Sequence, residues 1–130
     1  MPATIAEQPP ASSLVLICFA SWAIPGAGHL WLGRRSKGVS LLVALPVMFA
    51  IGLAIRGRLF PVDWSEPLVG LAALADLGIG LPYFVASSLG FGRGDVTAVT
   101  YEYGNAFLIV AGLLNLLVVI DVWDVALGRK

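Results

Sequence analysis

Long apolar runs separated by short polar connectors constrain this sequence more than any other feature. A helix needs about 20 mostly apolar residues to cross the roughly 30 Å hydrocarbon core of a bilayer, because each residue rises about 1.5 Å. None of the runs alternates polar and apolar residues as a barrel strand does, so the sequence predicts membrane helices. The predicted spans lie at residues 14–32, 39–55, 68–89 and 106–127.

The predicted fold class is therefore all-α, a polytopic integral membrane protein with four transmembrane helices in one domain over residues 1–130. The composition agrees, because 58% hydrophobic and only 12% charged residues cannot cover a soluble surface. We expect kinks in the first three helices, because Pro25-Gly26, Pro46 and Pro82 interrupt them. No internal repeat is visible in the sequence.

Residues 1–13 contain no lysine or arginine, so they predict an exposed tail rather than a cleavable signal peptide. Ser12 or Ser13 is placed to cap the first helix. If the first connector is cytoplasmic, the basic residues divide equally, with Arg34, Arg35, Lys37 and Arg93 inside and Arg56, Arg58, Arg129 and Lys130 outside. The three cations of the first connector, which follow a tail without lysine or arginine, break this tie and place both termini outside.

Charge and cysteine content exclude several classes of function. Eight basic and eight acidic residues cancel, so a nucleic-acid partner is not expected. The single Cys18 cannot form an intrachain disulfide. One histidine cannot supply a two-histidine metal site, and the glycines of residues 90–94 follow a membrane helix rather than a strand. The sequence predicts no catalytic residue, no metal site and no enzyme.

Asp76 lies near the middle of the third predicted span, where an aspartate costs about 2.5–3.5 kcal/mol and must face protein or water. It belongs to a small and polar stripe at helical spacing, formed by Ala73, Asp76, Gly80, Tyr83 and Ser87. The favoured interpretation is an aspartate that joins two helices. The alternative is a proton or cation relay.

The fourth predicted span carries two further polar pairs. Gly112 and Asn115 suit close helix packing, and Asn115 is a candidate partner for Asp76. Asp121 and Asp124 share a face near the far interface, where a solvated helix end is favoured over a site for a hard cation such as Mg²⁺ or Ca²⁺.

The segment Pro25 to Gly38 (PGAGHLWLGRRSKG) combines a helix break with a tight basic turn. Trp31 suits an interfacial anchor, and Arg34, Arg35 and Lys37 suit headgroup phosphates. Gly33 and Gly38 are expected to let the chain reverse. His29 is expected to donate to a carbonyl freed by the break. The alternative is an axial ligand to a tetrapyrrole pigment.

This segment resembles the hairpin of a family of small uncharacterised bacterial membrane proteins. Residues 111–130 (AGLLNLLVVIDVWDVALGRK) and 76–84 (DLGIGLPYF) are similar to the same family, and the hairpin resembles more loosely the two-transmembrane-helix domain. The resemblance implies a four-helix, multi-pass protein of the bacterial inner (cytoplasmic) membrane, without an established activity.

Two classes of function remain open. The first is a non-catalytic accessory subunit or assembly factor, packed against other subunits of a larger membrane complex such as a respiratory or photosynthetic one, with contacts to lipid or pigment. Small-residue helix faces motivate it. The second is a small transporter or an ion or proton pathway that uses Asp76, and four short helices would need to form a homo-oligomer for this role.

Overall fold

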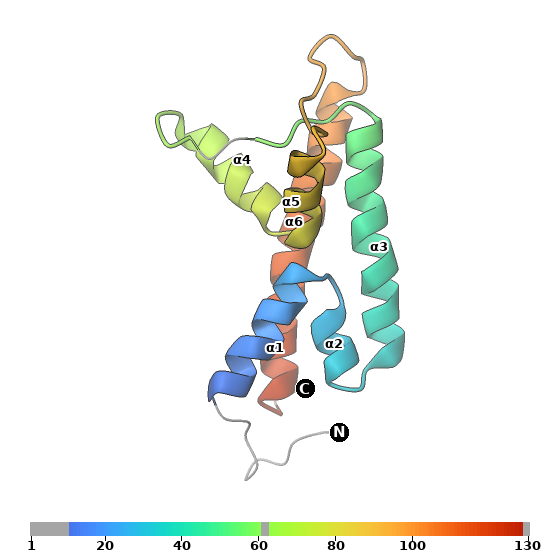
Figure 1. Ribbon diagram of the computed structural model, residues 1–130, viewed down its shortest axis with the longest axis vertical. Helices are drawn as coiled ribbons and strands as arrows, with labels where there is room; N and C mark the ends of the chain where they lie inside the picture. Colours follow the sequence, from blue (N-terminus) through green and yellow to red (C-terminus); the bar gives the residue numbers. More distant parts are fainter. Residues whose placement is uncertain (1–10, 61–62, 129–130) are drawn as a thin grey trace.

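A computed structural model describes residues 11–60 and 63–128. The regular elements of this part are helical, and it contains no strand beyond one isolated bridge between Arg58 and Arg93. The all-α prediction is confirmed. In chain order the helices are α1 (Ala11–Ala23), α2 (Ala27–Trp31), α3 (Arg35–Ala54), α4 (Pro67–Leu77), α5 (Leu81–Ser88) and α6 (Tyr101–Ala126) (Figure 1).

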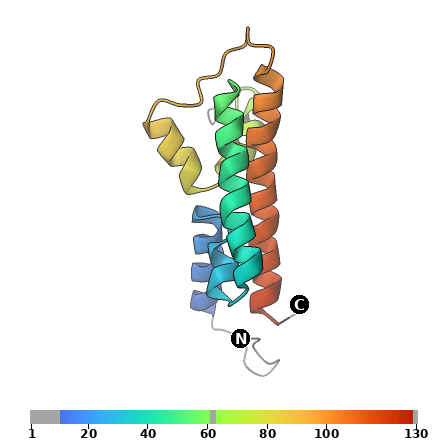
Figure 2. The same cartoon turned by 90° about the vertical axis from the view of Figure 1, so that its right-hand side faces the viewer.

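Two helices run the length of the molecule. α3 has 20 residues and α6 has 26, which corresponds to roughly 30 and 39 Å. They lie side by side along the long axis (Figure 1 and Figure 2). Both are long and apolar enough to cross a membrane, and α4 with α5 makes a third candidate if this bent pair is one span. The four predicted spans are not confirmed.

The first predicted span breaks at Pro25-Gly26, as expected, but the chain then reverses instead of continuing. Gly26 has φ +86°, a left-handed conformation that glycine adopts without the penalty of a Cβ. From there α2 returns toward the end at which α1 began (Figure 1). With 13 and 5 residues, or roughly 20 and 8 Å, neither helix reaches across a bilayer core.

The third predicted span also folds back on itself. α4 and α5 are bent by 108° at a break, where Gly80 has φ +87°. The Leu59 amide donates to Gly92 O at 2.8 Å, and Thr100 Oγ1 donates to Ile55 O at 2.7 Å. These bonds hold the entry to the α4–α5 pair and its exit at the same end, where α3 ends and α6 begins.

The two halves of the chain therefore repeat one arrangement in opposite directions. In each half, two short helices enter from one end, reverse near the middle of the long axis, and lead to a long helix that runs to the other end (Figure 1). Both views place α1 and α2 in one half of the length and α5 in the other (Figure 2). The two halves share the path of the chain but no visible repeat of amino acids, so the sequence does not reveal the repeat.

This path changes which connectors share an end. Lys37 Nζ lies 2.6 Å from Asp121 Oδ2, so the basic turn lies beside the last part of α6, at the end where α1 begins (Figure 1). Arg93 lies across the bridge from Arg58, at the opposite end. The prediction that Arg93 lies at the same end as the basic turn is wrong, because it assumed that every apolar run crosses the membrane once. Arg129 and Lys130 lie outside the described residues.

Three local expectations also change. Ser12 and Ser13 lie inside α1 and do not precede it. Pro46 lies inside α3, which continues as one helix on both sides of it. Gly38 belongs to the first turns of α3, where a Cβ would lie 2.6 Å from Leu30 Cγ. Its role is close contact with α2, while the turn uses Gly33 at φ +82°.

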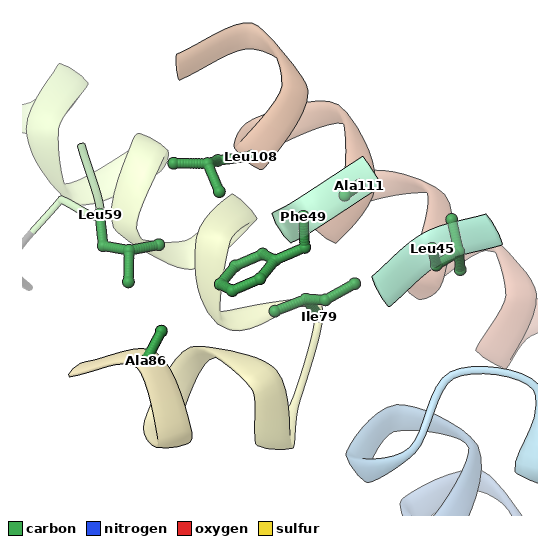
Figure 3. Close-up of a cluster of buried hydrophobic side chains, with 7 residues drawn as sticks. All are labelled: Leu45, Phe49, Leu59, Ile79, Ala86, Leu108 and Ala111. Atoms are coloured by element: carbon green, nitrogen blue, oxygen red, sulfur yellow. The ribbon is translucent and has the colours of Figure 1, made fainter. Parts of the chain in front are cut away.

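The main apolar cluster joins the long helices to the second hairpin. In Figure 3, the Phe49 and Ile79 side chains lie side by side between α3 and the break after α4. Ile79 is fully buried although it belongs to no helix, so burial of this side chain stabilises the reversal. The buried members are Leu45, Phe49, Leu59, Ile79, Ala86, Leu108 and Ala111.

Substitution of Gly80 tests the contact between the hairpins. A Cβ at Gly80 would lie 1.9 Å from Trp22 O, whereas a Cβ at Gly90 would meet only Arg93 Nη2 at 4.0 Å. Both glycines have left-handed φ values, +87° and +81°. We expect Gly80→Ala to lower the free energy of unfolding by about 2–5 kcal/mol, from strain plus overpacking. Gly90→Ala should cost about 1–2 kcal/mol, from strain alone.

The measurement is unfolding in mixed micelles, followed by tryptophan fluorescence. Equal destabilisation by the two substitutions would show that the hairpins do not touch at Gly80.

Candidate functional site

The polar contacts between the two hairpins lie where their tips meet. Asn115 on α6 donates through Nδ2 to Trp22 O at 2.9 Å and to Gly78 O at 2.8 Å. Trp22 Nε1 donates to Leu77 O at 2.9 Å. The three acceptors are carbonyls at helix ends, which have no partner within their own helices. We call these residues, together with Gly80, the hairpin junction.

Backbone contacts make the hairpin junction closely packed. A Cβ at Gly112 would lie 1.7 Å from Ala75 O, so α6 approaches α4 without an intervening side chain. Asn115 is fully buried, and its amide contacts carbonyls and not Asp76. Its Oδ1 has no hydrogen-bond partner in the described chain. The junction therefore joins α1, α4 and α6 through one side chain.

Asp76 is fully buried, but its carboxylate does not join two helices as expected. It binds the connector between α3 and α4. Its Oδ2 accepts from the Phe60 amide at 3.0 Å. The hydroxyl of Tyr83 lies 3.5 Å from Phe60 O, at the outer limit of a hydrogen bond. Within the described residues, Asp76 Oδ1 has no hydrogen-bond partner. A carboxyl in this position can exchange a proton only if water or another group reaches Oδ1.

The predicted small and polar stripe is not continuous. Ala73 and Asp76 lie on α4, whereas Tyr83 and Ser87 lie on α5, and the 108° bend separates them. Gly80 lies in the break itself and faces Trp22 O. Helical spacing in the sequence failed here, because it assumed one straight helix across the break.

A second polar cluster lies at the end of the molecule near the end of α6. We call it the end cluster, and it consists of His29, Lys37 and Asp121. Asp121 Oδ2 lies 3.0 Å from His29 Nε2 and 2.6 Å from Lys37 Nζ. His29 is fully buried, and its contact with Asp121 has the distance of an ion pair but not the alignment of a hydrogen bond.

The end cluster corrects two expectations. His29 contacts a carboxylate and not a freed carbonyl, and Asp121 is only 16% exposed, which does not fit a solvated helix end. Asp124 lies one turn further along α6 and is half-buried. At this end Trp31, Arg34 and Arg35 are exposed, which suits an interface.

The geometry gives no support to a pigment or a metal ion. Asp121 already lies at His29 Nε2, and a Cβ at the neighbouring Gly28 would lie 2.8 Å from both Ser21 and Val122. Little space is therefore left beside the imidazole. In residues 11–60 and 63–128, no group of three or more histidine, cysteine, aspartate or glutamate side chains is arranged to hold a metal.

Sequence reasoning missed Trp22 and the pairing of Arg58 with Arg93. An aromatic donor three residues before Pro25 was the available signal for Trp22, because a helix break exposes carbonyls that an indole N–H can satisfy. The two arginines carry no local signal. They meet only because the second hairpin returns to the end from which it entered.

The fold and these contacts define a protein whose described residues are all-helical and include two or three helices long and apolar enough to cross a membrane. Residues 16–130 match the family of unknown function DUF6677, and the chain belongs to this family. A search of curated proteins and a search of solved structures found no match. The hairpin junction and the end cluster both lie within the matched residues.

The Asn115 amide can be tested by removing its two hydrogen bonds. We expect Asn115→Leu to lower the free energy of unfolding by about 1–3 kcal/mol, because two buried carbonyls lose their donor. Asn105 is the matched control, since it lies on the same helix and accepts one bond, from the Arg58 amide at 2.7 Å. Asn105→Leu should cost less, about 0.5–1.5 kcal/mol. An equal or smaller effect at Asn115 in micelle unfolding would contradict this role.

The contacts of the end cluster predict how much each of three substitutions lowers the stability of the fold. Asp121→Asn should lower the free energy of unfolding by about 1–3 kcal/mol, because it removes the charge that faces His29 and Lys37. Lys37 is 47% exposed, so screening limits Lys37→Gln to about 0.5–1 kcal/mol. Arg35→Gln, in the same first turn of α3, is the control and should be nearly neutral. Equal thermal stability of all three variants in detergent would exclude a structural role for the cluster.

Proposed function

We propose that the chain is a non-catalytic integral protein of the bacterial cytoplasmic membrane, which packs as an accessory subunit or assembly factor in a larger membrane complex. In this proposal α3 and α6 span the bilayer, and the α1–α2 and α4–α5 pairs are re-entrant hairpins. Its partners are other membrane-protein subunits and lipid.

The observation that carries this proposal is the distribution of apolar side chains on the two long helices. Three valines at successive turns of α3 are 49–57% exposed, and three large aliphatic residues of α6 are 47–60% exposed. Lipid or the helices of a partner protein can cover such stripes, whereas water cannot do so without cost. The stripes consist of Val39, Val43 and Val47 on α3, and Leu113, Leu117 and Ile120 on α6.

The closed interior supports the same proposal. Asn115 and Asp76 are fully buried, and the hairpin tips touch at backbone distance at Gly80. An open groove of about 320 Å³ lies beside the tips, lined entirely by apolar residues and prolines such as Pro25, Pro46 and Pro82. This interior suits packing better than passage of an ion.

Purification of the full chain in a mild detergent, followed by mass spectrometry of what accompanies it, tests the proposal. We expect a stoichiometric membrane-protein partner. Val43→Asn and Leu117→Asn place the same amide on the two stripes, and the variant that loses the partner identifies the contact helix. Migration as a lone monomer, or full retention of the partner by both variants, would contradict the proposal.

A proton pathway through an oligomer is the second candidate, and one observation favours it. Asp76 is buried with one carboxylate oxygen lacking a hydrogen-bond partner in the described chain. Inverted repeats with helices that are interrupted near the midplane are also found in membrane transporters.

Proton flux into liposomes that carry a pH-sensitive dye tests this second candidate. Asp76→Asn should reduce the flux at least about tenfold, because an amide cannot carry the proton. Asp63→Asn is the control, because Asp63 is exposed and accepts hydrogen bonds from the Ser65 amide and hydroxyl. Flux that is the same in Asp76→Asn and in the unmodified chain would exclude this pathway.

A further inference from the structure

Two arginines are held opposite each other at the end where α3 finishes. Arg58 follows α3 and Arg93 follows α5, and the two residues form an isolated antiparallel bridge. The Leu59 amide donates to Gly92 O at 2.8 Å, which holds the two connectors together. Like charges directly opposite each other across a β pair destabilise it. A source of negative charge would therefore stabilise this arrangement.

The protein supplies little of that charge. Among the described residues, no acidic side chain forms an ion pair with Arg58 or Arg93. The nearby Asp95 carboxylate accepts from the Thr97 amide at 3.0 Å and from its hydroxyl at 2.6 Å. These bonds, with a smaller contribution from Arg56, hold the pKa of Asp95 below its usual value. Asp95 thus offsets Arg56 and leaves the other two arginines uncompensated.

An open cavity of about 420 Å³ lies between these arginines. Gly92 faces Leu59 so closely that a Cβ would lie 2.6 Å from Leu59 Cγ, which brings the loop backbone close to the segment that contains Arg58. The Arg58 guanidinium also lies 5.3 Å from the centre of the Phe60 ring, which limits its motion. The cavity is lined by Arg58, Leu59, Ser87, Gly90, Phe91, Gly92 and Arg93.

We propose that Arg58 and Arg93 bind the phosphate of an anionic phospholipid headgroup. Guanidinium groups present paired N–H donors that match phosphate oxygens, and the Ser87 side chain lines the same cavity. The apolar surroundings favour a lipid as the source of the phosphate. Leu89 and Phe91 are 67% and 59% exposed on either side of Gly90, where acyl chains would cover them. This site is separate from the faces proposed for a partner protein.

Native mass spectrometry of the full chain in detergent, with phosphatidylglycerol or phosphatidylcholine added, tests the proposal. We expect phosphatidylglycerol to stay bound and phosphatidylcholine to bind more weakly, because its headgroup carries no net charge. A guanidinium that donates hydrogen bonds to a phosphate contributes about tenfold or more to the affinity. Arg93→Gln should therefore weaken binding about tenfold, and the Arg58→Gln/Arg93→Gln double variant about 100-fold.

Arg35→Gln is the matched control, because Arg35 is an exposed arginine at the opposite end. Its removal measures the general attraction of one surface charge for an anionic headgroup, which should not exceed about fivefold. Circular dichroism of each variant shows whether it remains folded. Equal loss of phosphatidylglycerol from Arg35→Gln and Arg93→Gln would overturn the proposal in favour of general surface attraction. Equal retention of both lipids would overturn the requirement for an anionic headgroup. Displacement of the lipid by millimolar inorganic phosphate would show that free phosphate, and not a lipid, is the ligand.

Discussion

The structure depends most on the two hydrogen bonds that the Asn115 amide donates to Trp22 O and Gly78 O. A helix that stops inside an apolar region leaves carbonyls without partners, and each of these costs free energy unless a donor reaches it. Asn115 supplies that donor to both hairpins at once from the middle of α6. The indole of Trp22 adds a third bond, to Leu77 O. Loss of these donors would leave buried carbonyls without partners at both chain reversals, and the other contacts between the halves depend on both reversals.

Glycine is required where these reversals meet, because the approach is between backbones. The position of a Cβ at Gly80 or Gly112 would fall less than 2 Å from a carbonyl oxygen of a neighbouring segment, so only a hydrogen atom fits. Both reversals also use a glycine with φ near +86°, at Gly26 and at Gly80. The two halves thus solve the same problem in the same way. Short hairpins that meet end to end fill the length that a single straight helix would otherwise occupy.

Much of this could be predicted from the sequence, and the failures share one cause. The helical class, the break at Pro25-Gly26 and the uninterrupted last helix followed from apolar length and from the backbone chemistry of proline and glycine. The stripe through Asp76 and Tyr83, the grouping of Arg93 with the first basic turn, and the solvated Asp121 were wrong. Each assumed that a broken apolar run continues in its original direction. Hydropathy reports how long a run is, but it contains no information on direction after a break.

The sequence by itself determined that this chain forms apolar helices, where they break, and which polar residues lie among them, because these properties are local. Only the tertiary structure decided which polar groups meet. His29 and Lys37 reach Asp121, and Arg58 lies opposite Arg93, because each hairpin returns to the end from which it started. Contacts between residues so far apart in the chain depend on that return. It is set by packing at the hairpin tips, where Ile79, Gly80 and Asn115 bring segments from both halves together.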